Sequence, residues 1–301
     1  SLMQQATSRC GAVVPGPSAV ETLGSANTVL LSARELFPAG SVRLHGIKTF
    51  EKERIDIAIL YAASLLSPSC ETLRGVFMGM LDNNEKLLAG VENASVEIGY
   101  GFTGWIEHRR VLLGSREMMK RHDIEVPSLD YEKKYTKNGQ RSPIYLAVAG
   151  KLFGMFLVSY RPDRRAAESL AQSGISVLVQ ADDFNITAPL VAATYGIPEG
   201  TVKVLSQHEQ DALETELAYR PESEGVMMHT GACASFLGGM RAAARERLAG
   251  VVQTAAVTLG AVLSVALGFY EGLTGLSLGT VLAYQLVWCA IIASVPFAKK
   301  P

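Results

Sequence analysis

The chain has 301 residues, enough for two or three domains with a large buried core. Its formal net charge of −1 gives no basis for a nucleic-acid-binding surface. Its four cysteines are scattered without CxxC or Cys/His spacing, which indicates reduced thiols in an intracellular setting. The chain begins with Ser1 rather than Met, so we expect a fragment of a longer protein.

The first predicted strand is Asn27–Ser32, a short apolar run after the glycine-containing segment Cys10–Ser25. It ends in Ser32, and the sequence continues with Ala33-Arg34-Glu35-Leu36. A serine hydroxyl is a weak nucleophile unless a base lies beside it, and no His or second acid that could act as this base is near in sequence. A small polar residue that closes the strand is therefore the simplest interpretation of Ser32.

Shorter alternating strands and two helices predict an inserted α+β domain over residues 41–142. Within it, Gly99, Gly101 and Gly104 form a GxGxxG motif, and such glycines let a backbone approach a nucleotide closely. As a dinucleotide-binding signature the motif is weak, because a strand follows it instead of a helix. The alternative is a tight turn in a β-hairpin. The predicted elements are the strand Ser41–Phe50, the helices Lys52–Leu66 and Glu71–Leu81, and the strands Ser95–Ile106 and Arg110–Leu113.

After the insertion, the chain reads as a β-hairpin over Ser142–Ser159, with Gly150-Lys151 at its turn. A helix over Arg164–Ser173, the buried strand Ile175–Val179 and a helix over Thr187–Tyr195 follow. A helix, strand, helix series of this kind is typical of a doubly wound α/β sheet. Asp182 and Asp183 follow the strand, at the end where open α/β sheets carry their chemistry.

Most of the apolar excess lies in Leu248–Tyr270 and Leu276–Phe297, each long enough to cross a hydrocarbon core of about 30 Å. We expect Glu271–Gly275 to form the turn between them. Arginines precede the first span and lysines follow the second, so the positive-inside rule puts both ends in the cytoplasm. The alternative is a buried helical hairpin in a soluble protein.

The order Gly-Ile, apolar strand, polar loop with Asp and Thr-Ala helix over Gly174–Ile197 resembles the phosphorylation domain of P-type ATPases. These ion pumps have a haloacid-dehalogenase-like core, and the resemblance extends in segment order over nearly the whole chain. It implies a doubly wound phosphorylation domain, an inserted α+β nucleotide-binding domain and a C-terminal transmembrane helical hairpin. The implied boundaries are 1–40 and 143–240 for the phosphorylation-like domain, 41–142 for the insertion and 241–301 for the two membrane helices.

Several residues of the family's phosphoryl-transfer machinery are replaced in this chain. Where the resemblance implies the phosphorylated Asp of Asp-Lys-Thr-Gly-Thr, the chain has Ser32, and the position of the Lys that steadies the phosphoryl charge is Glu209. The loop that reads Thr-Gly-Asp in the family keeps Asp182 alone. In the hinge that supplies the last Mg²⁺ carboxylate, Thr230 and Gly231 match, but an alanine takes the place of the Asp.

For nucleotide binding, the resemblance implies Gly99, Gly101 and Gly104, together with Glu71 from the heavy-metal branch's Ser-Glu-His-Pro motif. The matching residues are Ser69-Cys70-Glu71-Thr72, without the His or the Pro. We therefore treat ATP as a candidate ligand, and the lost carboxylates argue against Mg²⁺.

Three functional hypotheses follow, and they leave open whether the chain is an enzyme. The first is a degenerate homologue that forms no aspartyl phosphate and acts as scaffold or regulator, because phosphoryl transfer depends on positioning and charge neutralisation. The second is an ATP-driven heavy-metal transporter in which Asp182 or Asp183 replaces Ser32. The third is a nucleotide sensor without hydrolysis. We expect a membrane location with cytoplasmic large domains, and as partners membrane lipid and other membrane subunits but no nucleic acid.

Overall fold

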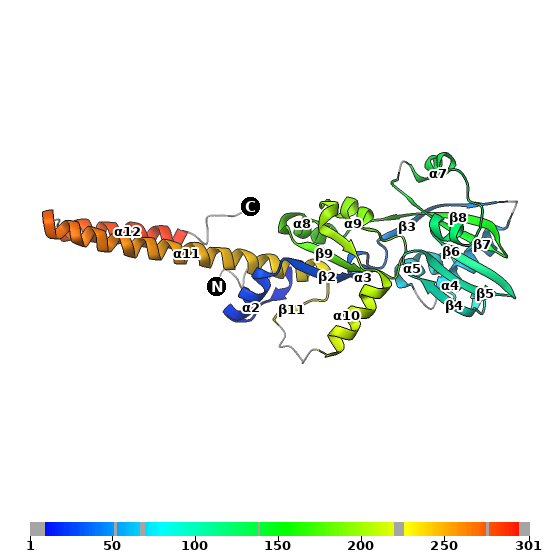
Figure 1. The fold of residues 1–301 in the computed structure, drawn as a ribbon, viewed down its shortest axis with the longest axis horizontal. Coiled ribbons are helices and arrows are strands. Elements are labelled where there is room, and N and C mark those ends of the chain that lie inside the picture. The colour runs from blue at the N-terminus through cyan, green and yellow to red at the C-terminus, as the bar shows by residue number, and fades with distance from the viewer. Residues whose placement is uncertain are drawn as a thin grey trace. The chain divides into compact units, whose positions relative to one another are not determined.

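The computed structural model describes residues 10–50, 53–66, 70–137, 139–219, 226–274 and 277–294. They divide into a large unit, Asn27–Ser223, and a terminal unit that joins Ser1–Ala26 to Glu224–Pro301. Figure 1 shows the elements of both units.

The large unit contains a parallel sheet of three strands in the order β10-β9-β2. Ser32 in β2 pairs with Gln180 in β9, and Val204 in β10 pairs with Val179 in β9. Because the strands run in one direction, their carboxyl ends meet at one edge of the sheet, as the sequence predicts for an α/β fold. The elements of this part are β2 (Thr28–Ser32), α3 (Ala33–Leu36), α8 (Arg164–Ser173), β9 (Ser176–Gln180), α9 (Ala188–Tyr195), the 3₁₀ turn η2 (Glu199–Thr201), β10 (Val202–Val204) and α10 (Gln207–Tyr219).

The rest of the large unit is built on an antiparallel sheet of six strands in the order β3-β8-β7-β6-β5-β4. Its elements are β3 (Val42–Thr49), α4 (Ile55–Leu66), α5 (Glu71–Gly79), the 3₁₀ turn η1 (Glu85–Leu87), β4 (Glu92–Glu97), β5 (Gly101–Ile106), β6 (Arg109–Gly114), α6 (Arg116–Arg121), α7 (Leu129–Thr136), β7 (Ser142–Val148) and β8 (Lys151–Tyr160). The residues Lys52 and Ser69 of the predicted elements lie outside the described residues.

This topology corrects the predicted end of the insertion at residue 142. The hairpin of β7 and β8 does form, but β8 pairs with β3 and β7 pairs with β6. These two strands are therefore central in the inserted sheet and do not belong to the second part of the phosphorylation-like domain. The remaining boundaries stay predictions.

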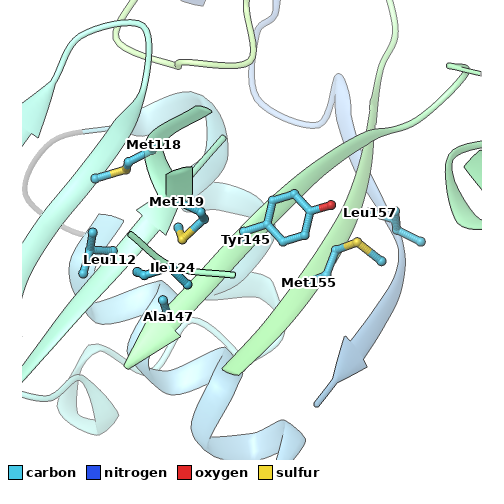
Figure 2. Packing of buried hydrophobic residues seen from close by; sticks show 8 residues of the cluster. All are labelled: Leu112, Met118, Met119, Ile124, Tyr145, Ala147, Met155 and Leu157. Atoms are coloured by element: carbon cyan, nitrogen blue, oxygen red, sulfur yellow. The ribbon is translucent and has the colours of Figure 1, made fainter. Parts of the chain in front are cut away.

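Helices cover both faces of the inserted sheet. Side chains alternate between the faces of a strand. In β8, Phe156 packs edge-to-face on Phe77 of α5, with ring centroids 4.9 Å apart. Its neighbours Met155 and Leu157 point to the opposite face, where they join a buried cluster that Figure 2 shows. The cluster consists of Leu112, Met118, Met119, Ile124, Tyr145, Ala147, Met155 and Leu157.

The terminal unit pairs two short strands and ends in long helices. Its elements are β1 (Ala12–Val13), α2 (Gly16–Ser25), β11 (Met228–His229), α11 (Cys233–Thr274) and α12 (Leu278–Ser294). Among the described residues, α11 is the single helix long and apolar enough to cross a membrane, with a mean hydropathy of 1.8 over its most apolar stretch. The apolar helix α12 is shorter, at 17 residues. The tyrosine Tyr284 in α12 donates a hydrogen bond to the carbonyl of Gly260 in α11, over 3.0 Å.

The first predicted span ends later than expected. Residues 271–274, which the sequence assigned to the turn, continue α11 as far as Thr274. Glu271 and Leu273 favour helix, and no proline interrupts the hydrogen bonding. Residues 275, 276 and 295–297 of the predicted turn and second span lie outside the described residues.

Candidate functional site

Three of the predicted site residues follow the three parallel strands. Ser32 ends β2, Asp182 follows β9, and Glu209 lies in the first turn of α10, directly after β10. Because the strands are parallel and adjacent, all three residues lie at the same edge of one sheet. The structure therefore brings these three predicted residues to one edge, and their role there stays a prediction.

Ser32 is the N-cap of α3. Its hydroxyl accepts a hydrogen bond from the backbone N–H of Arg34, over 3.3 Å, and the carboxylate of Glu35 accepts the N–H of Ser32, over 2.7 Å. This reciprocal arrangement is a capping box, which satisfies donors left unpaired at the start of a helix. The Ser32 hydroxyl thus has a structural partner in the backbone. Contrary to the expectation from the sequence, an acid is near, but the carboxylate of Glu35 contacts the N–H of Ser32 and not its hydroxyl.

Arg34 joins two of the predicted site residues to each other. Its guanidinium lies 3.2 Å from the carboxylate of Asp182 and 3.2 Å from the carboxylate of Glu71, at the start of α5. The side chains of Arg34, Glu71 and Asp182 are 55%, 67% and 42% exposed, so water weakens both ion pairs. Local sequence patterns do not identify Arg34 as a site residue, because its partners lie 37 and 148 residues further along the chain.

Asp183, the neighbour of Asp182, is buried with 1% of its surface exposed. Its carboxylate accepts hydrogen bonds from the Tyr160 hydroxyl and from the backbone N–H of Asn185. Burial raises the pKa of Asp183 to about 6, although these hydrogen bonds act in the opposite direction. A carboxylate enclosed in this way has no access to a phosphoryl donor in solution.

The carboxylate of Glu209 is held by a cation and by a serine of its own segment. It forms an ion pair with Lys203 of β10 and accepts hydrogen bonds of 2.9 Å from the N–H and the hydroxyl of Ser206. The contact with Lys203, followed by those with Ser206, lowers the pKa of Glu209 to about 2. Lys203 is a second residue that sequence reasoning missed, although it precedes Glu209 by only six positions.

Thr230 and Gly231 lie in the terminal unit, between β11 and α11. The N–H of Thr230 donates to the hydroxyl of Ser235, which in turn donates to the carbonyl of Gly11 over 2.7 Å. Gly231 has a φ of +86°, a left-handed conformation that favours glycine, and its N–H donates to the His229 ring. The two matching residues of the predicted hinge therefore build the turn that leads into α11.

The glycines of the GxGxxG motif have turn and packing roles in the inserted sheet. Gly99 lies in the turn between β4 and β5 with a φ of +79°. A Cβ on Gly101 would lie 2.3 Å from the carbonyl oxygen of Leu113, and one on Gly104 would lie 2.7 Å from the Val91 side chain. A left-handed turn at Gly99 and close packing at Gly101 and Gly104 explain these glycines without a ligand, in agreement with the hairpin alternative.

Acidic, His and Cys side chains do not gather into a metal site in the part of the chain that the structure describes, where no cluster of three or more was found. The four cysteines form no disulfide. Burial raises the pKa of Cys70, which precedes α5, so its thiol stays protonated.

No family model matches the chain. Among curated proteins it is 24% identical over 198 residues to "Copper-transporting ATPase 2" of Rhizobium meliloti, a match that covers 65% of this chain and 24% of that protein. It is 25% identical over 217 residues to a "Zinc-exporting P-type ATPase" of Mycobacterium marinum, covering 68% and 29%. A crystal structure of a zinc-transporting PIB-type ATPase matches with 13% identity and a TM-score of 0.44, over 97% of this chain and 53% of that one.

The chain spans about a quarter of the length of these curated relatives. Their relationship to the chain, together with the apolar length of α11, confirms the expected membrane location with cytoplasmic large domains. The resemblance drawn from Gly174–Ile197 and the segments around it is confirmed as well, and the chain is a homologue of the heavy-metal P-type ATPases.

Proposed function

We propose that this chain is a P-type ATPase homologue that forms no aspartyl phosphate and serves a membrane assembly as scaffold or regulator. The observation that carries the proposal is the pair of contacts from Arg34 to Asp182 and Glu71. They place a fixed cation of the chain itself on the carboxylate that remains at the phosphorylation-site edge.

The first supporting step is that, among the described residues, the candidate nucleophiles at this edge are all engaged by other groups. Ser32 caps a helix, and a neutral hydroxyl without a base attacks phosphorus poorly. Asp183 is enclosed by Tyr160 and Asn185, so it cannot replace Ser32 as the transporter hypothesis requires. Asp182 is accessible but paired with Arg34.

The second step concerns Mg²⁺, which the family implies. Mg²⁺ binds through carboxylates and waters in a strict octahedral arrangement. Here the carboxylate of Asp182 contacts the Arg34 guanidinium, and Ser32 and Ala232 stand where the resemblance implies carboxylates. These residues do not fit Mg²⁺, because a guanidinium and a dication compete for the same oxygens.

The third step concerns the phosphoryl charge. Phosphoryl transfer depends on cations that face the transferred group. At the position of the family's Lys, Glu209 is a carboxylate whose pKa of about 2 keeps it ionised, and it engages Lys203 as well. The carboxylate at this position therefore repels a phosphoryl group, because both are negatively charged. Membrane lipid around α11 and other membrane subunits are the partners that this proposal requires.

The test measures acid-stable phosphoenzyme in the full chain, purified in detergent and incubated with γ-labelled ATP and Mg²⁺. A copper-transporting relative serves as positive control. We expect no phosphoenzyme in the wild type or in Ser32→Asp. Asp caps helices as well as Ser does, so this variant keeps the capping box and its inactivity is not a folding artefact. Phosphoenzyme in either protein would refute the proposal.

A second measurement does not depend on catalysis. Binding of Mn²⁺ to the full chain, followed by electron paramagnetic resonance, should be the same in the wild type and in Asp182→Asn, because Arg34 already occupies this carboxylate. Wild-type binding that disappears in Asp182→Asn would contradict the cation argument. Equilibrium binding of ATP to the same preparations then separates the scaffold from the nucleotide sensor, which requires ATP binding without turnover.

A further inference from the structure

One face of the inserted sheet carries a group of cations that the proposed function does not use. We call it the basic row, and it consists of Arg43, His45, Lys137, Arg141 and Arg161. Arg43 and His45 come from β3, Arg161 follows β8, and Lys137 and Arg141 lie between α7 and β7.

The strand register places these residues side by side. Arg43 pairs with Ser159 across β3 and β8, so their side chains share a face. Arg161 directly follows β8, two residues beyond Ser159. Its N–H donates to the carbonyl of Ser41 over 2.9 Å, which continues the pairing with the segment before β3 and leaves Arg161 on the face of Ser159. Ser142 pairs with Val158, so Arg141, one residue earlier, continues this register beside Ser159.

A β-bulge turns His45 into this group. The pairing of β3 with β8 shifts between Leu44 and Gly46, which leaves His45 as the extra residue. Its ring lies 2.7 Å from the hydroxyl of Ser159. Bulges redirect side chains and are common beside functional sites. The basic row thus has an irregular strand and a hydrogen-bonded pair at its centre.

The cations of the row are not neutralised by acids nearby. Apart from partial burial, the groups that lower the pKa of His45 are Arg141, Arg161, Lys137 and Arg43. None of these four cations forms an ion pair within the described ranges, whereas the neighbouring Arg164 pairs with Glu168. Like charges so close together repel one another, and an anion would relieve this cost.

We propose that the basic row binds a short chain of phosphate groups. Arginine guanidinium groups match phosphate oxygens with paired hydrogen bonds. Arg43 and Arg141 are two strands apart, or about 10 Å. This span suits one di- or triphosphate, whereas a nucleic acid requires a longer basic stripe. The GxGxxG turn between β4 and β5 lies at the opposite end of the strand order, so it is not part of the basic row.

The probe is inorganic tripolyphosphate, titrated into the detergent-solubilised full chain by calorimetry. We expect binding that weakens as salt rises and that falls about tenfold in each of Arg43→Gln and Arg141→Gln, the loss expected for a charged hydrogen bond. Arg164→Gln is the matched control and should leave the affinity unchanged. Absence of binding at millimolar probe, or equal affinity in all four proteins, would overturn the proposal.

Two further arms identify the source of the phosphates. Affinity for ATP no higher than for tripolyphosphate supports a nucleoside-free polyphosphate, and much tighter ATP binding that is still lost in Arg43→Gln assigns the phosphates to a nucleotide. A single-stranded oligonucleotide that binds more tightly than either and depends on the row would overturn the small-ligand proposal. Arg43→Gln and Arg141→Gln each remove repulsion between like charges, so thermal melting should show that both variants are folded. If either variant unfolds, Arg43→Lys should show an intermediate affinity, because lysine keeps the positive charge but cannot form the paired hydrogen bonds of a guanidinium group.

Discussion

Asp183 makes the stability of the large unit depend on pH in a direction opposite to that of ordinary paired carboxylates. Its pKa is about 6 in the folded chain, against 3.8 for an unperturbed group, because burial disfavours the charged form. Between these values the folded chain holds a proton that the unfolded chain has released. The free energy of unfolding therefore falls as pH rises from about 4 to 6, by about 3 kcal/mol.

The substitution Asp183→Asn removes this dependence. The amide cannot ionise. Its oxygen can still accept from the N–H of Asn185, and its NH2 group can donate to the Tyr160 hydroxyl, which accepts as well as donates. The free energy of unfolding of the variant, relative to that of the wild type, should therefore rise by about 3 kcal/mol between pH 4 and 6. Above that range the difference between the two proteins should be constant.

Urea unfolding at a series of pH values measures this difference. The chain has two tryptophans, and a Trp288→Phe background leaves Trp105 as the fluorescent reporter of the large unit. Asp211→Asn, the same substitution at an exposed carboxylate of α10, is the control and should show no such trend. A difference between Asp183→Asn and the wild type that does not vary with pH would refute the claim that burial sets this pKa.

The same fluorescence assay tests two packing interpretations. Gly101→Ala should lose at least about 3 kcal/mol, because its Cβ would lie 2.3 Å from a backbone oxygen, whereas Gly99→Ala, strained but with open space, should lose about 1 kcal/mol. Equal losses would argue against the packing role of the motif. Glu132→Gln should lose about 3 kcal/mol, because it leaves the nearly buried Arg116 without its charged partner. Glu168→Gln, at an exposed pair, should change stability by less than about 0.5 kcal/mol.

Elements with local signals could be predicted closely. The helix over Arg164–Ser173 has the predicted bounds, because Asp163 caps its first turn and Gly174, with a φ of +65°, ends it. The helix ending before Gly196 follows the same logic, and the strand predicted over Ile175–Val179 forms one residue later, as Ser176–Gln180. In each case the signal lies within a few residues of the boundary, so one segment of sequence is sufficient.

Features that depend on distant partners could not be predicted. The hairpin of β7 and β8 forms where the sequence predicts it. Its place in the inserted sheet, however, depends on the pairing of β8 with β3, and β3 ends more than a hundred residues before β8 does. The ion pair of Arg34 with Asp182 spans 148 residues. Neither alternation nor capping encodes such pairings. The position of the candidate site at the sheet edge could consequently be predicted from the sequence, but the ion pairs that set its charge could not.

In the proposed function, that charge balance is what distinguishes this edge from one suited to phosphoryl transfer. Both Arg34 ion pairs are half exposed, so they contribute little stability, and their main effect is on which groups remain available. Asp182 and Glu71 share Arg34, and Glu209 has Lys203, so each carboxylate already faces a cation supplied by the chain. A site that binds Mg²⁺ keeps its carboxylates for the metal, and one that stabilises a phosphoryl group keeps its cations for the phosphate. Restoring an attacking Asp at position 32 would leave both requirements unmet, because Arg34 and Lys203 would still face the carboxylates of this edge.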